Sequence, residues 1–432
     1  MVKSACFADN AMGGTLARDH QSRAMTHVGR HRRTYVAYMD HDFDARVLAY
    51  DHDGSRWSDA VRIGTTQVEG HPPDGHNVPN LFVSRDGTIH LFYGSHGTPF
   101  RYARSKSPEE IDRWELGETI GERTTYPFVV ERTNGELLLF YRHGGAQIDS
   151  PLVFQRSRDL GGTWEDRVEV VRFGAPSSVK IHNVLYDASH DRIHFSLHDR
   201  TNVPVPALPS AFPAYYCAYD PAEGRVFGMN GDDLGPVADR RALIESHSRM
   251  APFELVDPED NATGWMDLCL HQGKPLFVFN DQQDRLYFGW WDGKEVVRHE
   301  LSPGTHHGVL ARSLAPTTTD GRNLRMYGIA LTDPPTDCNG GDLFVWTSED
   351  GGRTWDDGAC LIDRRGLGHG LDTLNLVMNY GGSGPFMLVP EPTGRWPEGL
   401  ERTPQNHYDN PSRRNRRLYA ADTEGCLFPR AG

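Results

Sequence analysis

The sequence predicts an all-β protein, a seven-bladed β-propeller with Asp-box turns. Short runs rich in β-branched and aromatic residues recur along the 432 residues, separated by Gly, Asp, Asn and Pro. Seven of these runs resemble one another at intervals of about 50 to 60 residues, a period that suits four-stranded blades. No long amphipathic helical pattern interrupts them.

The seven runs are the expected central strands of successive blades. They are 35–40, 90–95, 137–143, 193–199, 276–281, 325–330 and 386–390. Several follow a tight-turn signal that makes a hairpin, as in SRDGTIHLFY and ERTNGELLLFY. The wider interval before Leu276 is expected to hold an insertion. The N-terminal segment is expected to complete the last blade, so that 1–432 form a single propeller domain without exposed sheet edges.

Two later turns match the Asp-box pattern S-x-D-x-G-x-T-W. They are SRDLGGTW at 157–164 and SEDGGRTW at 348–355. The Asp side chain can accept hydrogen bonds from its own turn, the glycine accepts unusual backbone angles, and the tryptophan packs between sheets. Asp159 and Asp350 are therefore interpreted as structural residues on the side of the propeller away from an active face.

Composition excludes several classes of protein. The net charge of −14 argues against a nucleic-acid or anionic-membrane partner, because both need an extended positive surface. No apolar run is long enough to span a membrane, and the N-terminus lacks the apolar core of a signal peptide. Either the protein is cytoplasmic or a leader has been removed. The six scattered cysteines form no C-x-x-C pair and are expected to be buried free thiols.

Two histidines are expected to meet at one end of a hairpin. In HNVPNLFVSRDGTIHLFYGSH the turn centres near Asp86, and His76 and His96 lie equally far from it. Residues equidistant from a hairpin turn lie opposite each other in an antiparallel pair. Asn77, next to His76, is a candidate for substrate binding at the same place.

The same construction on the next two hairpins gathers more polar side chains at the corresponding end. These are Tyr126, Tyr141, Arg142 and His143 from one blade, and Lys180, His182 and His198 from the next. A lone histidine is more often structural than catalytic. Agreement among three adjacent blades favours a site at one rim of the central channel.

This set of residues suits proton abstraction better than glycoside hydrolysis, for which closely paired carboxylates are expected. A hexuronate has an acidified C5–H beside its carboxylate. Its removal needs a base such as His or Tyr, charge neutralisation of the carboxylate, and an acid that protonates the leaving oxygen. Arg156, in VFQRSRD, can supply a bidentate partner for the carboxylate, although it could equally be a surface arginine.

At these residues the chain resembles the BNR-repeat polysaccharide lyases with seven-bladed propellers, notably the ulvan lyases and related rhamnose–glucuronate lyases. The resemblance rests on DGHNVPNLFVSRDGTIHLFYGSH, LLLFYRHGG, LVFQRSRDLGGTW and GWMDLCLHQGKPLFVF. It implies catalytic roles for His76, His96, Tyr141 and Arg156, with the arginine neutralising the carboxylate. Tyr141 could act as both base and acid in a syn elimination, with His76 or His96 as the partner in an anti elimination.

The implied substrate is an anionic, uronate-containing glycan of glucuronate or iduronate, cleaved by β-elimination. The chain departs from the ulvan-lyase pattern at KIHNVLYD and HFSLHDRTNVP, which leaves the exact glycan open. The chemistry requires no cofactor, and a structural divalent cation, Ca²⁺ or Zn²⁺, stays open because no diagnostic ligand spacing is present.

Two other functions compete with a lyase. A sialidase-like Asp-box glycosidase needs an arginine triad, a tyrosine nucleophile and usually an early R-I-P segment, and this chain has GRHRRTYVAY and no such tripeptide. A non-catalytic carbohydrate-binding propeller would use the rim aromatics as stacking platforms. An assay for the unsaturated product separates a lyase from both.

Overall fold

The structure is a computed structural model. It describes residues 5–12, 24–71, 74–94, 96–144, 150–173, 177–201, 214–236, 266–271, 273–280, 286–301, 309–316, 323–331, 341–364, 370–371, 374–380, 386–392 and 415–428. Over these residues the chain forms strands β1 to β30 and no α-helix, in agreement with the all-β prediction. Within the same residues, no helix is long and apolar enough to cross a membrane.

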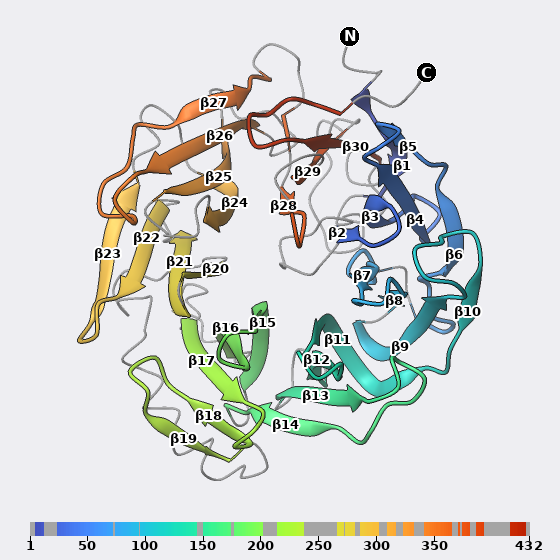
Figure 1. Cartoon of the computed structure of the whole chain (residues 1–432), viewed down its shortest axis with the longest axis horizontal. Helices are drawn as coiled ribbons and strands as arrows, with labels where there is room; N and C mark the ends of the chain where they lie inside the picture. Colours follow the sequence, from blue (N-terminus) through green and yellow to red (C-terminus); the bar gives the residue numbers. More distant parts are fainter. Residues whose placement is uncertain are drawn as a thin grey trace.

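Six hydrogen-bonded sheets surround a common axis in a propeller-like arrangement (Figure 1). The first sheet contains β2 (Ala24–Val28), β3 (Arg32–Met39), β4 (Asp44–Asp51), β5 (Arg56–Trp57) and β6 (Val61–Thr65). The largest, with eight strands, contains β7 (Asn80–Val83), β8 (Ile89–Tyr93), β9 (His96–Ser105), β10 (Trp114–Leu116), β11 (Ile120–Glu131), β12 (Leu137–His143), β13 (Leu152–Ser157) and β14 (Val168–Val171).

The remaining four sheets follow around the ring. One contains β15 (Ser177–Asp187), β16 (Arg192–Thr201), β17 (Ala214–Asp220), β18 (Arg225–Phe227) and β19 (Asp233–Pro236). The next contains β20 (Met266–His271), β21 (Lys274–Asn280), β22 (Leu286–Trp291) and β23 (Val296–Leu301). It is followed by β24 (Val309–Pro316), β25 (Leu324–Leu331), β26 (Gly341–Ser348) and β27 (Ala359–Ile362). The last contains β1 (Ala8–Ala11), β28 (Asn375–Leu376), β29 (Met387–Pro392) and β30 (Arg416–Ala421).

All seven predicted central runs are strands. They correspond to β3, β8, β12, β16, β21, β25 and β29, and only Ser95 and Asp281 of the predicted runs lie outside the described residues. The hydrogen-bonded sheets are fewer than the predicted repeats because β9 pairs with both β8 and β11, which joins two groups of four strands. The insertion expected before Leu276 falls largely on 237–265, outside the described residues.

The N-terminal strand closes the ring, as predicted. Strand β1 pairs antiparallel with β30, where Ala8 lies opposite Leu418 and Ala11 opposite Arg416. Strands β1 and β30 accordingly lie side by side in Figure 1. This pairing joins the two ends of the described chain within one sheet, the arrangement by which a propeller ring is closed.

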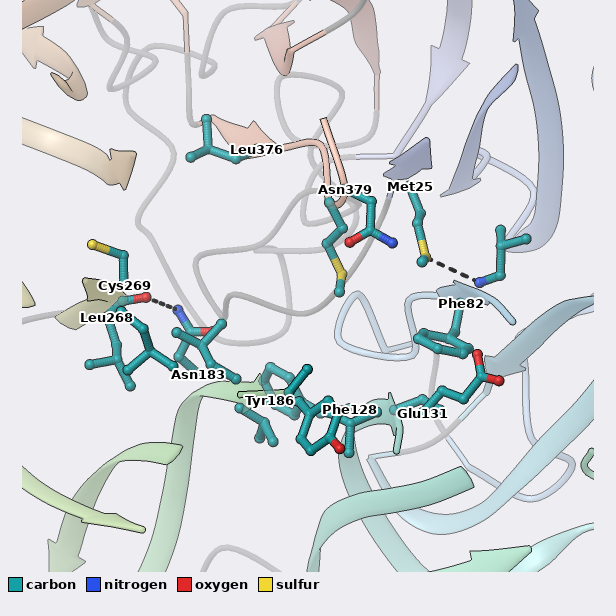
Figure 2. A pocket seen from close by; sticks show the side chains of 18 of the residues that line it. Met25, Phe82, Phe128, Glu131, Asn183, Tyr186, Leu268, Cys269, Leu376 and Asn379 are labelled. Carbon is teal, nitrogen blue, oxygen red and sulfur yellow. Dashed lines mark hydrogen bonds between the residues drawn. The ribbon is translucent and has the colours of Figure 1, made fainter. Parts of the chain in front are cut away.

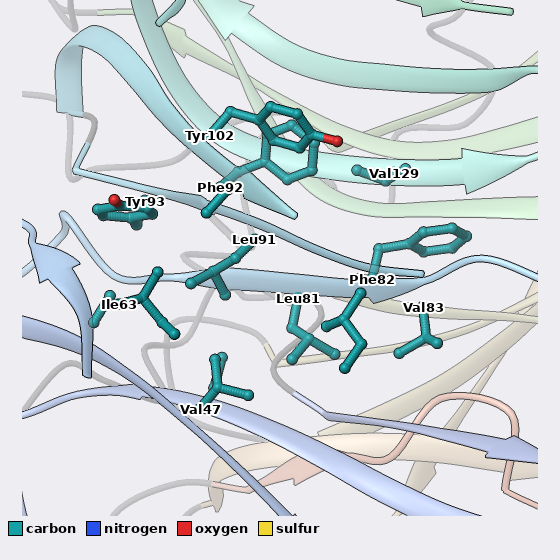
Figure 3. Close-up of a cluster of buried hydrophobic side chains, with 14 of the residues drawn as sticks. Val47, Ile63, Leu81, Phe82, Val83, Leu91, Phe92, Tyr93, Tyr102 and Val129 are labelled. Atoms are coloured by element: carbon teal, nitrogen blue, oxygen red, sulfur yellow. The ribbon is translucent and has the colours of Figure 1, made fainter. Parts of the chain in front are cut away.

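Apolar side chains pack between neighbouring sheets. In the cluster of Figure 3, Val47 of β4 and Ile63 of β6 face residues of the eight-stranded sheet, among them Leu81 and Leu91. Leu81 and Leu91 are fully buried. Burial of one such side chain typically contributes about 1.5–3 kcal/mol. These contacts join neighbouring sheets of the ring.

Both predicted Asp-box sequences form self-bonded turns. Asp159 Oδ1 accepts hydrogen bonds from Ser157 Oγ (2.8 Å) and from the backbone N–H of Thr163 (2.8 Å). Asp350 Oδ1 likewise accepts from Ser348 Oγ (2.9 Å) and from the backbone N–H of Thr354 (2.9 Å). The carboxylates are therefore occupied within their own turns, which fits the structural role expected for them.

Within the described residues the cysteines form no disulfide with one another, as expected, but not all are buried. Cys6, Cys217 and Cys269 are buried, whereas Cys360 and Cys426 are exposed. Cys360 lies on β27, and Cys426 follows β30. Cys338 lies outside the described residues. The expectation of buried thiols was thus wrong for the two on these outer segments.

Candidate active site

His76 and His96 form a stacked pair held by one carboxylate. Their ring centroids are 4.5 Å apart with an interplanar angle of 25°. His76 Nδ1 lies 2.7 Å from Asp74 Oδ1, and His96 Nδ1 lies 2.6 Å from Asp74 Oδ2. A single Asp side chain therefore orients both imidazoles, one through each oxygen.

The pairing follows from the hairpin register predicted for this segment. Asn80 lies opposite Phe92 and Val83 opposite Ile89, so the β7–β8 hairpin is centred on Asp86. Continued outward, the same register sets position 76 opposite position 96. The prediction that the two histidines are neighbours is confirmed.

A short turn fixes Asp74 beside the hairpin. Its Oδ1 also accepts the backbone N–H of His76 (2.9 Å), and its carbonyl oxygen accepts the N–H of Asn77 (3.3 Å). Asn77 is buried, and its Nδ2 donates to the carbonyl of Thr66 (3.2 Å). Asn77 therefore anchors the turn, and its amide is already used in the fold.

Charge and exposure distinguish the three side chains. Burial by itself would raise the pKa of Asp74, but the hydrogen bonds and charges of His76 and His96 outweigh it and hold that pKa well below its usual value. The histidine side chains keep 40% and 27% of their surface exposed. Since each Nδ1 faces Asp74, each Nε2 lies on the opposite edge of its ring.

Tyr126 and Arg142 lie next to this pair. The ring of Tyr126 is 6.2 Å from that of His96, and Arg142 Cζ lies 5.0 Å from the centroid of the Tyr126 ring. Both residues are buried. Tyr126 sits in an irregular part of β11, where the pairing with β12 shifts between Thr125 and Phe128, and its φ is +59°. Such a backbone conformation costs a non-glycine residue about 1–3 kcal/mol and is concentrated at functional sites.

Tyr141 is not brought to the histidines. It neighbours Arg142 on β12, so its side chain points to the other face of the sheet. There it is fully buried, with its ring 5.5 Å from that of Phe100. Its hydroxyl donates to Gln155 Oε1 (2.7 Å), and burial raises its pKa. This hydroxyl has an internal partner and a core environment.

Arg156 lies at the opposite end of the same sheet. Along β13, Leu152 pairs with Arg142, whereas Arg156 pairs with Leu138, four residues further from the histidine end. Its guanidinium lies near Glu136 (3.8 Å) and Glu165 (4.0 Å). The structure therefore separates Arg156 from His76 and His96, whereas Arg142 lies at the histidine end of the sheet, against the ring of Tyr126.

The remaining predicted residues lie around the same end. His143 is partly buried, and burial followed by the charge of Arg167 lowers its pKa. On the next sheet, Lys180 pairs with His198, as the hairpin construction predicted, although the side chain of His198 lies outside the described part. His182 is buried at the point where the β15–β16 register shifts.

Asp74 is the residue that sequence reasoning missed. It lies two positions before His76 in DGHN, a spacing that suits an Asp side chain bonding the backbone two residues on. Asp74, His76 and His96 are also a set, within the described part of the chain, whose ligand atoms all lie within 4.8 Å and could hold a metal ion. Metal binding there would have to replace the two Nδ1 hydrogen bonds.

A separate cavity occupies the axis of the ring. It measures about 630 Å³ and is lined by inner strands, with Phe82, Phe128 and Leu268 among its apolar side chains (Figure 2). A buried hydrogen bond from Asn183 Nδ2 to Asp267 Oδ1 (2.6 Å) lies in its wall. Its lining also includes the carboxylates of Glu131 and Asp267 and the basic side chains of His27 and Arg85, so it is mixed in character.

The fold and the site together define a propeller-like all-β protein with an ionisable cluster at one end of a sheet. Comparison with known proteins narrows this class. The family described as BNR repeat-containing family member matches residues 33–231. The ulvan lyase of Nonlabens ulvanivorans is 23% identical over 408 residues, which cover 85% of this chain and 82% of that protein. The ulvan lyase of Alteromonas sp. (strain LOR) is 33% identical over 185 residues, which cover 38% of this chain and 37% of that protein.

Solved structures give the same result for the fold. A polysaccharide lyase PL25 ulvan lyase bound to -[GlcA(1-4)Rha3S]- matches with a TM-score of 0.76 at 20% identity, covering 99% of this chain and 97% of that one. The BP39L lectin from Burkholderia pseudomallei matches with a TM-score of 0.52 at 11% identity, covering 95% of each chain. The chain thus resembles the BNR-repeat polysaccharide lyases of the ulvan-lyase kind, and the predicted resemblance is confirmed.

Proposed function

We propose that this protein is a polysaccharide or oligosaccharide lyase that cleaves a glycosidic bond at a uronic acid by β-elimination. The observation that carries the proposal is the pair of stacked histidines on Asp74, beside Tyr126 and Arg142. Uronate elimination needs a base, an acid and a cation for the carboxylate. The similarity to ulvan lyases over 85% of the chain supports the same reaction class.

In the proposed reaction a neutral imidazole Nε2 takes the C5 proton. The electron pair of that C–H bond forms the C4=C5 double bond, the C4–O bond breaks, and the leaving oxygen takes a proton from an acid. We assign the base to His76, because its side chain is the more exposed of the pair. The candidates for the acid are His96, which stacks on His76, and Tyr126, whose ring lies 6.2 Å from that of His96.

Arg142 is the proposed partner of the uronate carboxylate. A guanidinium can bind a carboxylate through two parallel hydrogen bonds and stabilise the negative charge that grows there as C5 loses its proton. Arg142 lies at the histidine end of the sheet, whereas Arg156 lies at the other end beside Glu136. Position therefore favours Arg142 for the role that the sequence suggested for Arg156.

The proposed substrate is an anionic glycan that contains glucuronate or iduronate. A structural neighbour was solved with -[GlcA(1-4)Rha3S]- bound, so a uronate linked to a sulfated rhamnose is the first glycan to test. The protein's own net charge of −14 makes a local cationic group such as Arg142 necessary for holding such a polyanion.

For the fold, we propose a single seven-bladed propeller over 1–432 in which the eight-stranded sheet counts as two blades. Support comes from the position of the seven predicted runs, each of which lies on the second strand of its sheet or, in the eight-stranded sheet, of one of its two groups of four. The self-bonded turns at Asp159 and Asp350 are proposed as Asp-boxes on this basis.

The proposal is tested by screening uronate-containing glycans for a product with the ultraviolet absorbance of an unsaturated uronate. A lyase gives this absorbance together with new reducing ends. A glycosidase would give reducing ends without it, and a carbohydrate-binding propeller would bind the glycan without giving either. Either of the last two results across the whole panel would overturn the proposal.

A further inference from the structure

One carboxylate serves two rings in the candidate site. Asp74 Oδ1 accepts from the His76 backbone N–H (2.9 Å) and lies 2.7 Å from His76 Nδ1, while Oδ2 lies 2.6 Å from His96 Nδ1. An ionised carboxylate offers only acceptors, so each Nδ1 must be the protonated nitrogen of its ring. The neutral form of each histidine then carries its lone pair on Nε2.

We propose that Asp74 is a positioning residue that sets the tautomer and the orientation of both His76 and His96, so that the two Nε2 atoms are presented together to the sugar. This inference rests on the proposed lyase function for its kinetic consequence. Asp74 itself reaches no sugar atom in this role. It acts through the two rings, which it holds stacked 4.5 Å apart.

The carboxylate is well placed to do this because its own position is fixed. The backbone of its turn is closed by the hydrogen bond from Asn77 N–H to the Asp74 carbonyl. Buried Asn77 in turn accepts at its carbonyl the N–H of Gly94, two residues before His96. Two hydrogen bonds therefore join the turn that carries His76 to the strand end that carries His96. One runs from Gly94 N–H to the Asn77 carbonyl, and the other joins His96 Nδ1 to Asp74 Oδ2.

The variant Asp74→Asn separates this role from a purely structural one. The amide oxygen of Asn can still accept from the His76 backbone and from His76 Nδ1, so the turn is preserved. Its NH₂ group replaces Oδ2, and a donor facing His96 Nδ1 forces the proton of that ring to Nε2. One ring of the pair then presents N–H where it previously presented a lone pair.

The expected kinetic result for Asp74→Asn is a fall in kcat of about 10²- to 10⁴-fold, the contribution of a general acid or base, because a wrong tautomer disables the histidine that depends on it. KM should change little, because Asp74 does not touch substrate. The matched control is Asp86→Asn in the turn of the same hairpin, where the carboxylate accepts from Ser84 Oγ (2.6 Å) and Thr88 N–H (3.0 Å). This control should keep the wild-type kcat. A wild-type kcat for Asp74→Asn would overturn the proposal.

The tautomers are read directly by ¹⁵N NMR of the histidine rings, which does not depend on turnover. Both rings should be protonated at Nδ1 in the wild type, and His96 should change to Nε2–H in Asp74→Asn. Wild-type rings protonated at Nε2, or a stoichiometric divalent ion that the wild type binds and Asp74→Asn loses, would overturn the proposal. If the wild type forms no unsaturated product from any glycan, the proposed function fails, and the NMR result still decides the role of Asp74.

Discussion

Replacement of His76 by alanine should abolish most of the turnover while leaving the fold intact. Loss of a general base typically costs about 10²- to 10⁴-fold in rate, which corresponds to about 2.7–5.4 kcal/mol in the activation free energy. The stability cost should be far smaller. The side chain of His76 is 40% exposed, and Asp74 keeps its hydrogen bonds to the His76 backbone and to His96.

The loss of one partly exposed hydrogen bond should lower the free energy of unfolding by no more than about 1 kcal/mol. The assay is the initial rate of unsaturated-product formation, with thermal unfolding measured on the same preparation. His190→Ala is the matched control. His190 Nδ1 makes a similar 2.6 Å contact with Asp187, but its side chain is 62% exposed and lies in the β15–β16 turn.

The control should keep the wild-type rate. If His76→Ala retained more than about a tenth of the wild-type kcat in a folded protein, His76 could not be the base, because a 10²-fold loss is the least that this role predicts. A large fall in melting temperature with a matching loss of rate would instead assign His76 a structural role.

Three further predictions follow from the described geometry. Arg142→Lys should lower kcat/KM about 10-fold or more, because lysine keeps the charge but loses the bidentate geometry. Arg156→Ala should leave kcat/KM unchanged. The reverse pattern would assign the carboxylate to Arg156 and not to Arg142. Tyr141→Phe should reduce the free energy of unfolding by about 1 kcal/mol through loss of the Gln155 hydrogen bond without slowing turnover, and a slowed but equally stable variant would contradict its placement in the core. Burial lowers the pKa of His90 from 6.5 to about 4. The free energy of unfolding should therefore be highest above pH 6.5 and should fall by about 3 kcal/mol as the pH drops toward 4, because the buried ring must take up a proton. Denaturant unfolding measured between these pH values should show a smaller decrease in His90→Asn.

The sequence predicted those parts of the site that depend on hairpin symmetry. An antiparallel pair is specified by its turn, so the Asp86 turn alone sets His76 and His96 opposite each other. The pairing of Lys180 with His198 was predictable for the same reason. Closure by the N-terminal strand also followed from the number of repeats and the need to cover sheet edges.

The remaining parts of the candidate site could not be predicted from the periodicity of the sequence. Tyr141 and Arg142 are adjacent on a strand, so their side chains must face opposite ways. Periodicity does not show which of the two faces the histidine end, because the pairing of β11 with β12 is irregular around Tyr126. Arg156 immediately precedes an Asp-box turn, which already indicates the far end of the strand. Asp74 acts through a side-chain turn that leaves no repeating pattern in the sequence.

The most direct test of the account is to digest a glucuronate–rhamnose glycan with the wild-type protein in ¹⁸O-labelled water and to analyse the products by mass spectrometry. Elimination consumes no water, so the account predicts chain ends that carry an unsaturated uronate, lack ¹⁸O, and are lighter by one water molecule than hydrolysis products. The same products should form much more slowly with His76→Ala. Products with saturated uronate ends, heavier by one molecule of water than the elimination products, would show hydrolysis and contradict the assignment of this protein as a lyase.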